Sequence, residues 1–295
     1  MPQHPNRRKV LKNVLAGTAA ITTSGMLSPL TAYAESKATA KLAGNINHAV
    51  CRWCFNDMTV DALCAAAKEM GIKGIDLVGP KDWPTLKKYG LQSTMCNGAE
   101  ISLTEGWNHP QYHDQLIKNY SEMIPLVSKA GYKNLICFSG NRNGMDDETG
   151  LQNCAEGLKK VLPLAEKHNV VLVMELLNSK IDHKDYMCDH TAWGVELAKR
   201  TGSENFKLLY DIYHMQIDEG DVIRTIKDSH PYIAHYHTAG VPGRHEIDET
   251  QELFYPAIMR AIKETGFKGF VAQEFIPVQN DKMASLRQAV KVCDV

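Results

Sequence analysis

The sequence predicts an α/β fold in which residues 47–295 form a single (β/α)8 barrel. Eight short apolar runs alternate with eight runs of helical spacing over about 250 residues, the usual size of such a barrel. Each of the last four apolar runs ends on an acid or a histidine, as strands do when a parallel barrel builds a site at their carboxyl ends. The composition agrees, because 295 residues with 44% hydrophobic side chains suit one well-buried domain.

The expected strands are short apolar runs of the kind that a parallel sheet buries on both faces. In chain order they cover residues 47–55, 73–78, 91–97, 133–139, 170–175, 208–211, 232–237 and 269–274. The sixth run is the clearest, since Leu208-Leu209-Tyr210 is apolar, Asp211 follows directly, and His214 comes three residues later.

The expected helices lie between these runs and show the spacing of an amphipathic helix. In chain order they cover residues 59–70, 81–89, 111–130, 146–168, 185–201, 221–228, 251–265 and 281–292. The first is typical, because Thr59 is suited to cap its amino end and Gly71 to end it. A glycine also follows the helices that end near residues 130, 201 and 265.

The amino-terminal 34 residues are typical of an export signal. Arg7-Arg8 forms a twin-arginine pair, an apolar run follows from Val14 to Leu27, and Ala32-Tyr33-Ala34 matches a cleavage site. The apolar run is too short to span a membrane, so we expect no span in the mature protein. The sequence therefore predicts a twin-arginine signal peptide over residues 1–34, a linker over 35–46 and a periplasmic mature protein.

Charge and cysteine content narrow the function classes. A formal net charge of −1 gives no overall field that would attract nucleic acid, so we expect a small-molecule substrate and no nucleic-acid partner. Cys51 and Cys54 form a C-x-x-C without a second such pair, which argues against a four-cysteine zinc site. Within an expected strand they are best read as buried free thiols, although an exported protein could also form a disulfide. The sequence leaves a homo-oligomer open.

Four residues at neighbouring strand ends form the expected metal site. Glu175, Asp211, His237 and Glu274 end strands five, six, seven and eight, which adjoin one another in a closed barrel. Three carboxylates this close would not all stay ionised without a cation. Oxygen-rich ligands with one imidazole suit one divalent metal, manganese, magnesium or cobalt before zinc.

Longer motifs around these residues resemble a known family. They are Glu175-Leu-Leu-Asn178, Tyr210-Asp211-Ile-Tyr213-His214-Met-Gln216 and Ala239-Gly-Val-Pro-Gly243-Arg244-His245-Glu246. With them, residues 47–293 resemble the xylose-isomerase-like TIM barrel superfamily (AP endonuclease family 2), above all its hydroxypyruvate isomerases. The resemblance implies that Glu175, Asp211, His237 and Glu274 hold one divalent metal and that Glu175 and Glu274 are the catalytic acid–base pair. It also implies that His214 and Arg244 contact the substrate.

This assignment agrees with the chemistry of an aldose–ketose type isomerisation. Such a reaction moves a proton between adjacent carbons through an enediolate, and it needs a base, an acid and a cation. Arg244 is suited to bind a substrate carboxylate in bidentate fashion. We therefore expect an isomerase that acts on a small hydroxy-keto acid or sugar, with Trp53, Asn97 and Lys180 as further candidate substrate contacts.

Three other functions fit the sequence less well than an isomerase does. Ketose 3-epimerases of the same superfamily have a histidine at the position of His237, where many hydroxypyruvate isomerases have an amide, so a 3-epimerase is the main alternative. A metal-dependent endonuclease would need more histidines, yet strands two, three and four end on Val78, Asn97 and Ser139. A non-catalytic sugar-binding barrel would have no need of both glutamates and the whole ligand set.

Overall fold

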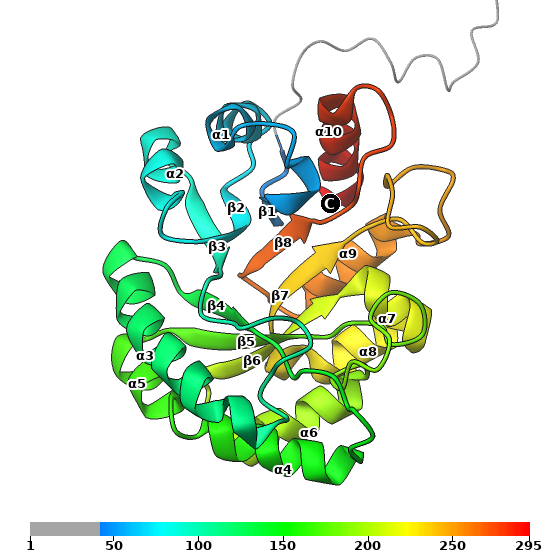
Figure 1. Cartoon of the computed structure of the whole chain (residues 1–295). Coiled ribbons are helices and arrows are strands. Elements are labelled where there is room, and N and C mark those ends of the chain that lie inside the picture. The colour runs from blue at the N-terminus through cyan, green and yellow to red at the C-terminus, as the bar shows by residue number, and fades with distance from the viewer. Residues whose placement is uncertain (1–41) are drawn as a thin grey trace, which may run out of the picture. The chain divides into compact units, whose positions relative to one another are not determined.

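A computed structural model describes residues 42–295 and shows a closed barrel of eight parallel strands in the order β1 to β8 (Figure 1). The strands are β1 (Asn47–Cys51), β2 (Gly74–Val78), β3 (Gln92–Cys96), β4 (Asn134–Cys137), β5 (Val171–Glu175), β6 (Phe206–Asp211), β7 (Ile233–Thr238) and β8 (Phe270–Gln273). The ring closes where Asn47 to Val50 of β1 pair in parallel with Phe270 to Gln273 of β8. The predicted (β/α)8 barrel is thus confirmed.

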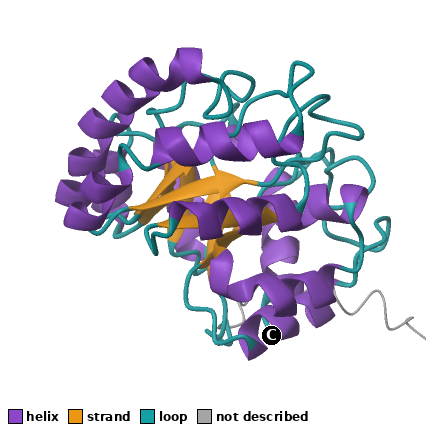
Figure 2. Ribbon diagram, turned by 90° about the horizontal axis from the view of Figure 1, so that it is seen from below, coloured by secondary structure: helices purple, strands orange, loops and turns teal. Residues whose placement is uncertain are grey.

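Helices surround the strands, as the view at right angles to Figure 1 also shows (Figure 2). The α-helices are α1 (Val60–Glu69), α2 (Trp83–Tyr89), α3 (His113–Ala130), α4 (Asp147–Leu158), α5 (Leu162–His168), α6 (Thr191–Thr201), α7 (Ile212–Asp218), α8 (Val222–Ser229), α9 (Tyr255–Glu264) and α10 (Lys282–Cys293). Short 3-10 helices are η3 (Trp53–Phe55), η4 (Pro110–Tyr112) and η5 (His230–Tyr232). Several helix starts are capped by side chains, for example by Thr59 and Asp281.

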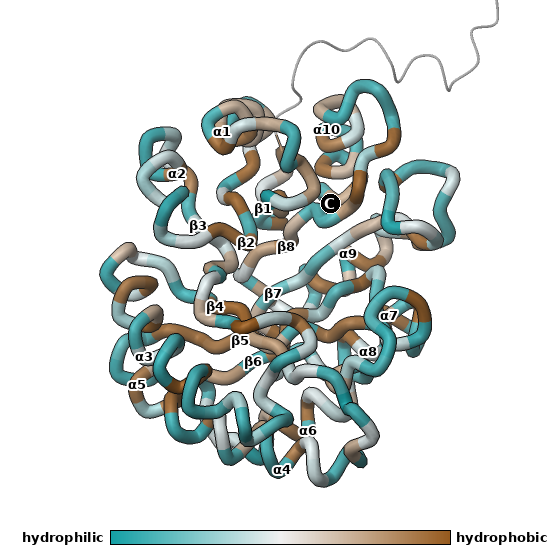
Figure 3. Tube along the Cα trace, in the orientation of Figure 1, coloured by the Kyte–Doolittle hydropathy of each residue, from teal (hydrophilic) through white to brown (hydrophobic). Residues whose placement is uncertain are grey.

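Strands β4 and β5 are strongly apolar, whereas the outer helices alternate between apolar and polar positions (Figure 3). All five residues of β5 and all four of β4 are buried. Helices such as α9 bury one stripe of apolar residues against the strands and expose the opposite face. The burial of the strands on all sides fixes their carboxyl ends and thereby the positions of the polar residues there.

Several elements differ from the prediction. The helix expected over 185–201 begins only at Thr191, because residues 185–190 form a loop. The first strand ends at Cys51 rather than at residue 55, because the chain turns into the 3-10 helix η3. The helix expected over 146–168 is divided into α4 and α5, with Pro163 in the first turn of α5, where its ring is tolerated. Helix α7 was not predicted; it begins directly after Asp211, with no glycine or proline to mark the change.

The predicted signal peptide over 1–34, and most of the linker, lie outside the described residues. Within residues 42–295 no helix is both long enough and apolar enough to cross a membrane. All eight cysteines fall in the described part, and all are free and buried. The interpretation of Cys51 and Cys54 as buried thiols is therefore confirmed, although Cys54 lies in η3 and not in a strand.

Candidate metal centre

The structure brings the four predicted ligands together at the carboxyl ends of β5 to β8. Glu175, Asp211, His237 and Glu274 are all buried, and each offers a ligand atom within 4.8 Å of those of the other three. The register of the strands explains why these side chains lie close together, because Asp211 of β6 pairs with His237 of β7. Glu274 follows β8 directly, and its amide donates to the carbonyl of Thr238 at 2.9 Å, which sets it beside β7.

His237 lies between the two glutamates. Its Nδ1 is 3.1 Å from Oε1 of Glu175 and 2.7 Å from Oε2 of Glu274. Its Nε2 points the other way, 2.8 Å from Oδ2 of Asp76. Burial alone would lower the pKa of His237, but the charge of Glu274 together with the contacts of Cys51 and Asp76 outweighs it and raises the pKa well above the usual value. One ring nitrogen therefore faces the cluster, while the other faces the barrel interior.

The two glutamates sit in unequal surroundings. Burial and the nearby charge of Glu274 raise the pKa of Glu175. Burial would also raise the pKa of Glu274, but the charges of Arg244 and His237 hold it well below its usual range. Trp53, which is 36% exposed in η3, donates its indole N–H to Oε1 of Glu274 at 2.7 Å.

Arg244 reaches the cluster from the loop after β7. Its guanidinium donates to Oδ2 of Asp211 at 3.1 Å, forms an ion pair with Glu274, and contacts Nε2 of His214 at 2.8 Å. The guanidinium also lies over the rings of Trp53 and Tyr213, 5.3 and 5.2 Å from their centroids. Since an arginine only donates, Nε2 of His214 accepts, and the ring is kept neutral because burial and the charge of Arg244 lower its pKa.

Of the predicted substrate contacts, Trp53, His214 and Arg244 lie at the cluster, whereas Asn97 and Lys180 have no described contact with it. Asn97 follows β3, on the opposite side of the ring from β7, and is half-buried. Lys180 is exposed in the loop after β5, where its ammonium donates to the carbonyl of Ile217 at 3.1 Å. A substrate role for Asn97 or Lys180 stays a prediction.

Sequence reasoning missed two residues that hold the site residues in place. Asn178 ends the motif Glu175-Leu-Leu-Asn178, and its amide lies 2.6 Å from Nδ1 of His214. Asp76 is an acid within the apolar run Gly74–Val78, which is the one sign of it in the sequence. Both interactions join residues of different strands or loops, which a single sequence does not pair.

Glu246 connects the two loops that carry Arg244 and Glu274. This buried carboxylate accepts from the amides of Val278 and Gln279 and from the hydroxyl of Ser285, each at 3.0 Å. The amide of Ile276 in turn donates to the carbonyl of Arg244 at 2.7 Å. Arg244 has a backbone φ of 60°, which is unusual for a residue other than glycine. The loop after β8 therefore braces the backbone from which the Arg244 side chain projects.

The donor set fits a divalent metal. Three carboxylates and one imidazole nitrogen converge from four neighbouring strand ends, and oxygen-rich sets of this kind suit hard or borderline cations. The second nitrogen of His237 already has a carboxylate partner, as is usual for a metal-binding histidine. Within residues 42–295 a second group, Cys51, Asp76 and His237, also brings its ligand atoms within 4.8 Å of one another.

Comparison with known proteins gives both sequence and fold relatives. The family model described as "Xylose isomerase-like TIM barrel" matches residues 64–293. The 2-oxo-tetronate isomerase of Cupriavidus necator is 34% identical over 122 residues, which cover 41% of this chain and 46% of that protein. The hydroxypyruvate isomerase of Escherichia coli is 25% identical over 232 residues, which cover 75% of this chain and 89% of that protein. The chain thus spans less than half the length of the first of these two curated relatives.

Solved structures share the architecture. An AP endonuclease, family 2, from Brucella melitensis superposes with a TM-score of 0.70 at 24% identity, covering 82% of this chain and 97% of that one. A D-psicose 3-epimerase from Clostridium cellulolyticum superposes with a TM-score of 0.67 at 16% identity, covering 84% of this chain and 90% of that one. At these identities the likeness concerns the fold.

Proposed function

Because the chain belongs to the xylose isomerase-like TIM barrel family, we propose that it is a divalent-metal-dependent isomerase of a small hydroxy-keto acid or sugar. The observation that carries the proposal is the pair of buried glutamates, Glu175 and Glu274, on the two sides of His237. The names of the two isomerase relatives support the same reaction class. The proposal treats the protein as a hydroxypyruvate isomerase-like enzyme that is exported to the periplasm.

The metal would be held by Glu175, Asp211, His237 and Glu274, with manganese, magnesium or cobalt preferred and zinc as the alternative. When bound, it supplies positive charge next to the substrate oxygens on which negative charge develops. Asp211 has an additional duty, since its Oδ1 accepts the amide N–H of Tyr213 at 2.8 Å. This bond leaves Oδ2 directed at the cluster, where Arg244 donates to it.

The proton transfer is assigned to the two glutamates. One carboxylate removes a proton from a substrate carbon, the other supplies a proton to the adjacent carbon, and the hydroxyl proton passes to the former carbonyl oxygen, so that a hydroxyl and a carbonyl exchange places. Both groups belong to the same buried cluster, and both face Nδ1 of His237. Trp53 fixes Oε1 of Glu274 by its hydrogen bond, which sets the direction in which this carboxylate points.

The substrate side of the site is assigned to Arg244, His214 and Trp53. Arg244 offers donors in a planar fork that matches a carboxylate, and the neutral His214 offers a ring nitrogen beside it. These groups favour a small substrate that bears an acid or several hydroxyls. The exposed edge of Trp53 gives the same region an apolar wall.

Proton NMR in deuterated water tests the reaction class. The protein is loaded with Mg²⁺, a diamagnetic ion, and incubated with hydroxypyruvate and with a panel of ketoses. The expected result is deuterium incorporation at the carbon next to the carbonyl, together with the appearance of the isomeric carbonyl compound. Binding of these compounds without any exchange would instead identify a sugar-binding barrel and contradict the proposal.

Replacing Glu274 by Gln separates proton transfer from metal binding. The variant keeps a ligand oxygen of similar shape, so it should still bind metal, more weakly, while deuterium exchange at saturating metal falls at least about a hundredfold. His237→Gln is the contrasting variant, because it leaves both glutamates in place. Its activity should fall through metal affinity and recover at high metal concentration. Wild-type exchange by the Glu274→Gln protein would show that the base lies elsewhere, with His214 as the next candidate.

A ketose 3-epimerase is the second candidate, and His237 is the residue that favours it. The same NMR experiment distinguishes the two reactions by the carbon atom that takes up deuterium and by the product. An epimerase incorporates deuterium at carbon 3 of a ketose and inverts that centre, whereas an isomerase produces an aldehyde from the ketone.

A further inference from the structure

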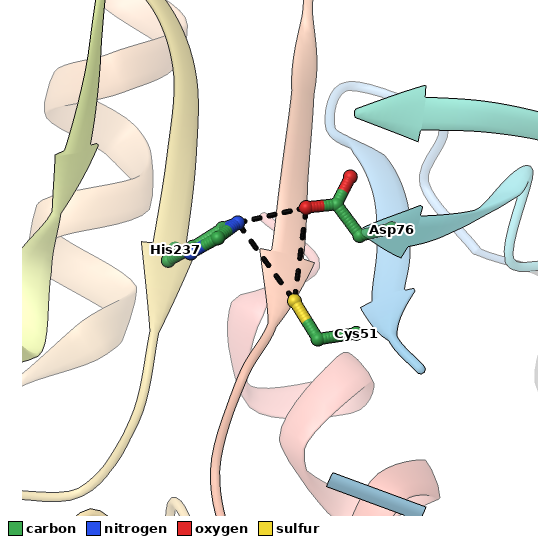
Figure 4. A group of neighbouring side chains, drawn as sticks. All are labelled: Cys51, Asp76 and His237. Atoms are coloured by element: carbon green, nitrogen blue, oxygen red, sulfur yellow. Dashed lines mark hydrogen bonds and ion pairs between the residues drawn. The ribbon is translucent and has the colours of Figure 1, made fainter. Parts of the chain in front are cut away.

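Asp76 is a fully buried acid inside the barrel, across the interior from β7. Its Oδ2 lies 2.8 Å from Nε2 of His237, and its Oδ1 accepts a short hydrogen bond from the hydroxyl of Thr94. Figure 4 shows Asp76 on β2 and His237 on β7 directed toward one another, with Cys51 of β1 beneath them. Side chains of three strands that are far apart in the sequence thus meet at one point.

A carboxylate at this depth requires an explanation. Barrel interiors are normally filled by branched apolar side chains, and β2 is otherwise apolar. Burying a charge costs free energy unless partners compensate for it. The partners of Asp76 are Thr94, the thiol of Cys51, the buried His235 at 3.2 Å and His237 of the metal cluster. The bond to His237 is the shorter of the two histidine contacts, and it joins Asp76 to the cluster.

The two nitrogens of His237 have different partners. Nδ1 faces Glu175 and Glu274, and Nε2 faces Asp76. A histidine binds a metal through the lone pair of one ring nitrogen, and the acceptor at the other nitrogen decides which one carries the proton. A carboxylate at Nε2 holds a proton there, so Nδ1, which faces the cluster, is the nitrogen that would bind a metal.

We propose that Asp76 is the positioning residue of the metal centre, which holds the proton of His237 on Nε2 and fixes the plane of its ring. The proposal rests on the proposed metal site, and it adds a residue that does not itself touch the metal. It also explains why an acid is tolerated in β2.

The same residues could be read as a second metal site, since Sγ of Cys51 is 3.7 Å from Asp76 and 3.7 Å from His237. The number of ligands argues against this reading. This group offers three ligand atoms, whereas a closed tetrahedral site needs four and the cluster at the strand ends offers four. The separation of 2.8 Å between Nε2 of His237 and Oδ2 of Asp76 is that of a direct hydrogen bond.

Calorimetric titration of the metal-free protein with Mn²⁺ tests the proposal. We expect one metal per chain in the wild type and an affinity about 10- to 100-fold lower in Asp76→Asn. Cys51→Ala is the matched control, because Cys51 touches the same two side chains, and its affinity should stay within about twofold of the wild type. In a His237→Gln background, adding Asp76→Asn should change the affinity little, because the residue on which Asp76 acts is then gone.

Several outcomes would overturn the proposal. They are an unchanged affinity in Asp76→Asn, losses that simply add in the double variant, and two metals per wild-type chain of which Cys51→Ala loses one. Nitrogen-15 NMR of the Mg²⁺-loaded wild type needs no variant, so it decides the question even if Asp76→Asn does not fold. The proton of His237 is expected on Nε2, and a proton on Nδ1 would contradict the proposal.

These measurements distinguish a failure of the proposed role of Asp76 from a failure of the proposed isomerase function. A wild type that binds one Mn²⁺ but exchanges no substrate proton overturns the isomerase proposal and leaves the role of Asp76 intact. A wild type that turns over substrate with unchanged metal affinity in Asp76→Asn overturns only the role of Asp76. A wild type that binds no Mn²⁺ overturns both.

Discussion

At the scale of single residues, the site depends on a few polar contacts that direct each carboxylate oxygen. The two oxygens of Glu274 have different partners, the indole of Trp53 at Oε1 and the groups of Arg244 and His237 at Oε2. This division orients the carboxylate more tightly than an ion pair alone, because each hydrogen bond fixes a different oxygen.

Trp53→Phe tests the contribution of the indole N–H. The substitution keeps an aromatic ring but removes the donor, and a hydrogen bond to a charged group is worth about 1.5 kcal/mol, so kcat/KM should fall about tenfold. Trp83→Phe is the matched control, since the indole of Trp83 in α2 donates to the carbonyl of Val78 in β2, a strand that carries none of the four ligands. That control should lower Tm and leave kcat/KM unchanged. An equal loss of activity in both variants would show that the Trp53 bond has no specific role.

At the scale of elements, helix α7 begins at the residue after a metal-ligand candidate. Asp211 is both the last residue of β6 and the amino-terminal cap of α7, because Oδ1 accepts the amide N–H groups of Tyr213 and His214. The sequence could not separate strand from helix here, since Leu208 to Tyr213 reads as one apolar run broken only by Asp211. The cap places His214 on the first turn, beside Arg244.

Asp211→Asn and Asp211→Ala should therefore differ in stability. Asparagine can still cap α7, whereas alanine cannot, so we expect the alanine variant to be less stable than the asparagine variant by about 1 kcal/mol. Both should bind metal more weakly, because both lose the carboxylate. Urea unfolding of the two metal-free variants measures the difference, and equal unfolding midpoints would rule out a capping role.

At the scale of the whole molecule, the fold was predictable from the sequence and part of the site was not. The alternation of apolar runs and helical spacing specifies a barrel, and Glu175, Asp211, His237 and Glu274 could be found because strand ends in a parallel barrel share one face. Asp76 could not be paired with His237, since they are 161 positions apart and meet only through the closed interior. Asn178 could not be paired with His214 either, because the two residues lie in the loop after β5 and in α7 and meet only in the folded chain.

Acid stability should respond to His48, which is buried in β1 with Nε2 3.5 Å from Asp294. Burial lowers the pKa of His48, against the charge of Asp294. Below about pH 6.5 the unfolded chain binds a proton here that the folded barrel does not, so the stability that is present above this pH falls as the pH decreases. Comparing Tm at about pH 7.5 and about pH 5.5, we expect a smaller drop for His48→Gln than for the wild type. Equal drops would contradict this account.

Export is the remaining prediction at this scale, and it concerns residues outside the described part of the chain. We propose that residues 1–34 are removed, because the Arg7-Arg8 pair, the apolar run and Ala32-Tyr33-Ala34 follow one another in the order of a twin-arginine signal. Mass spectrometry of the protein recovered from its native host should find Glu35 at the amino terminus. A mature protein that retains Arg7-Arg8 would refute the proposal.

The contacts of Glu246 bear on how this barrel can change. They join the segment after β8 to the loop after β7, and the amide of Ile276 holds the backbone of Arg244. These two loops are therefore not independent modules. A loop grafted after β8 from another barrel would replace the amides that Glu246 and Arg244 accept from, so an exchange aimed at new specificity should transfer both loops together.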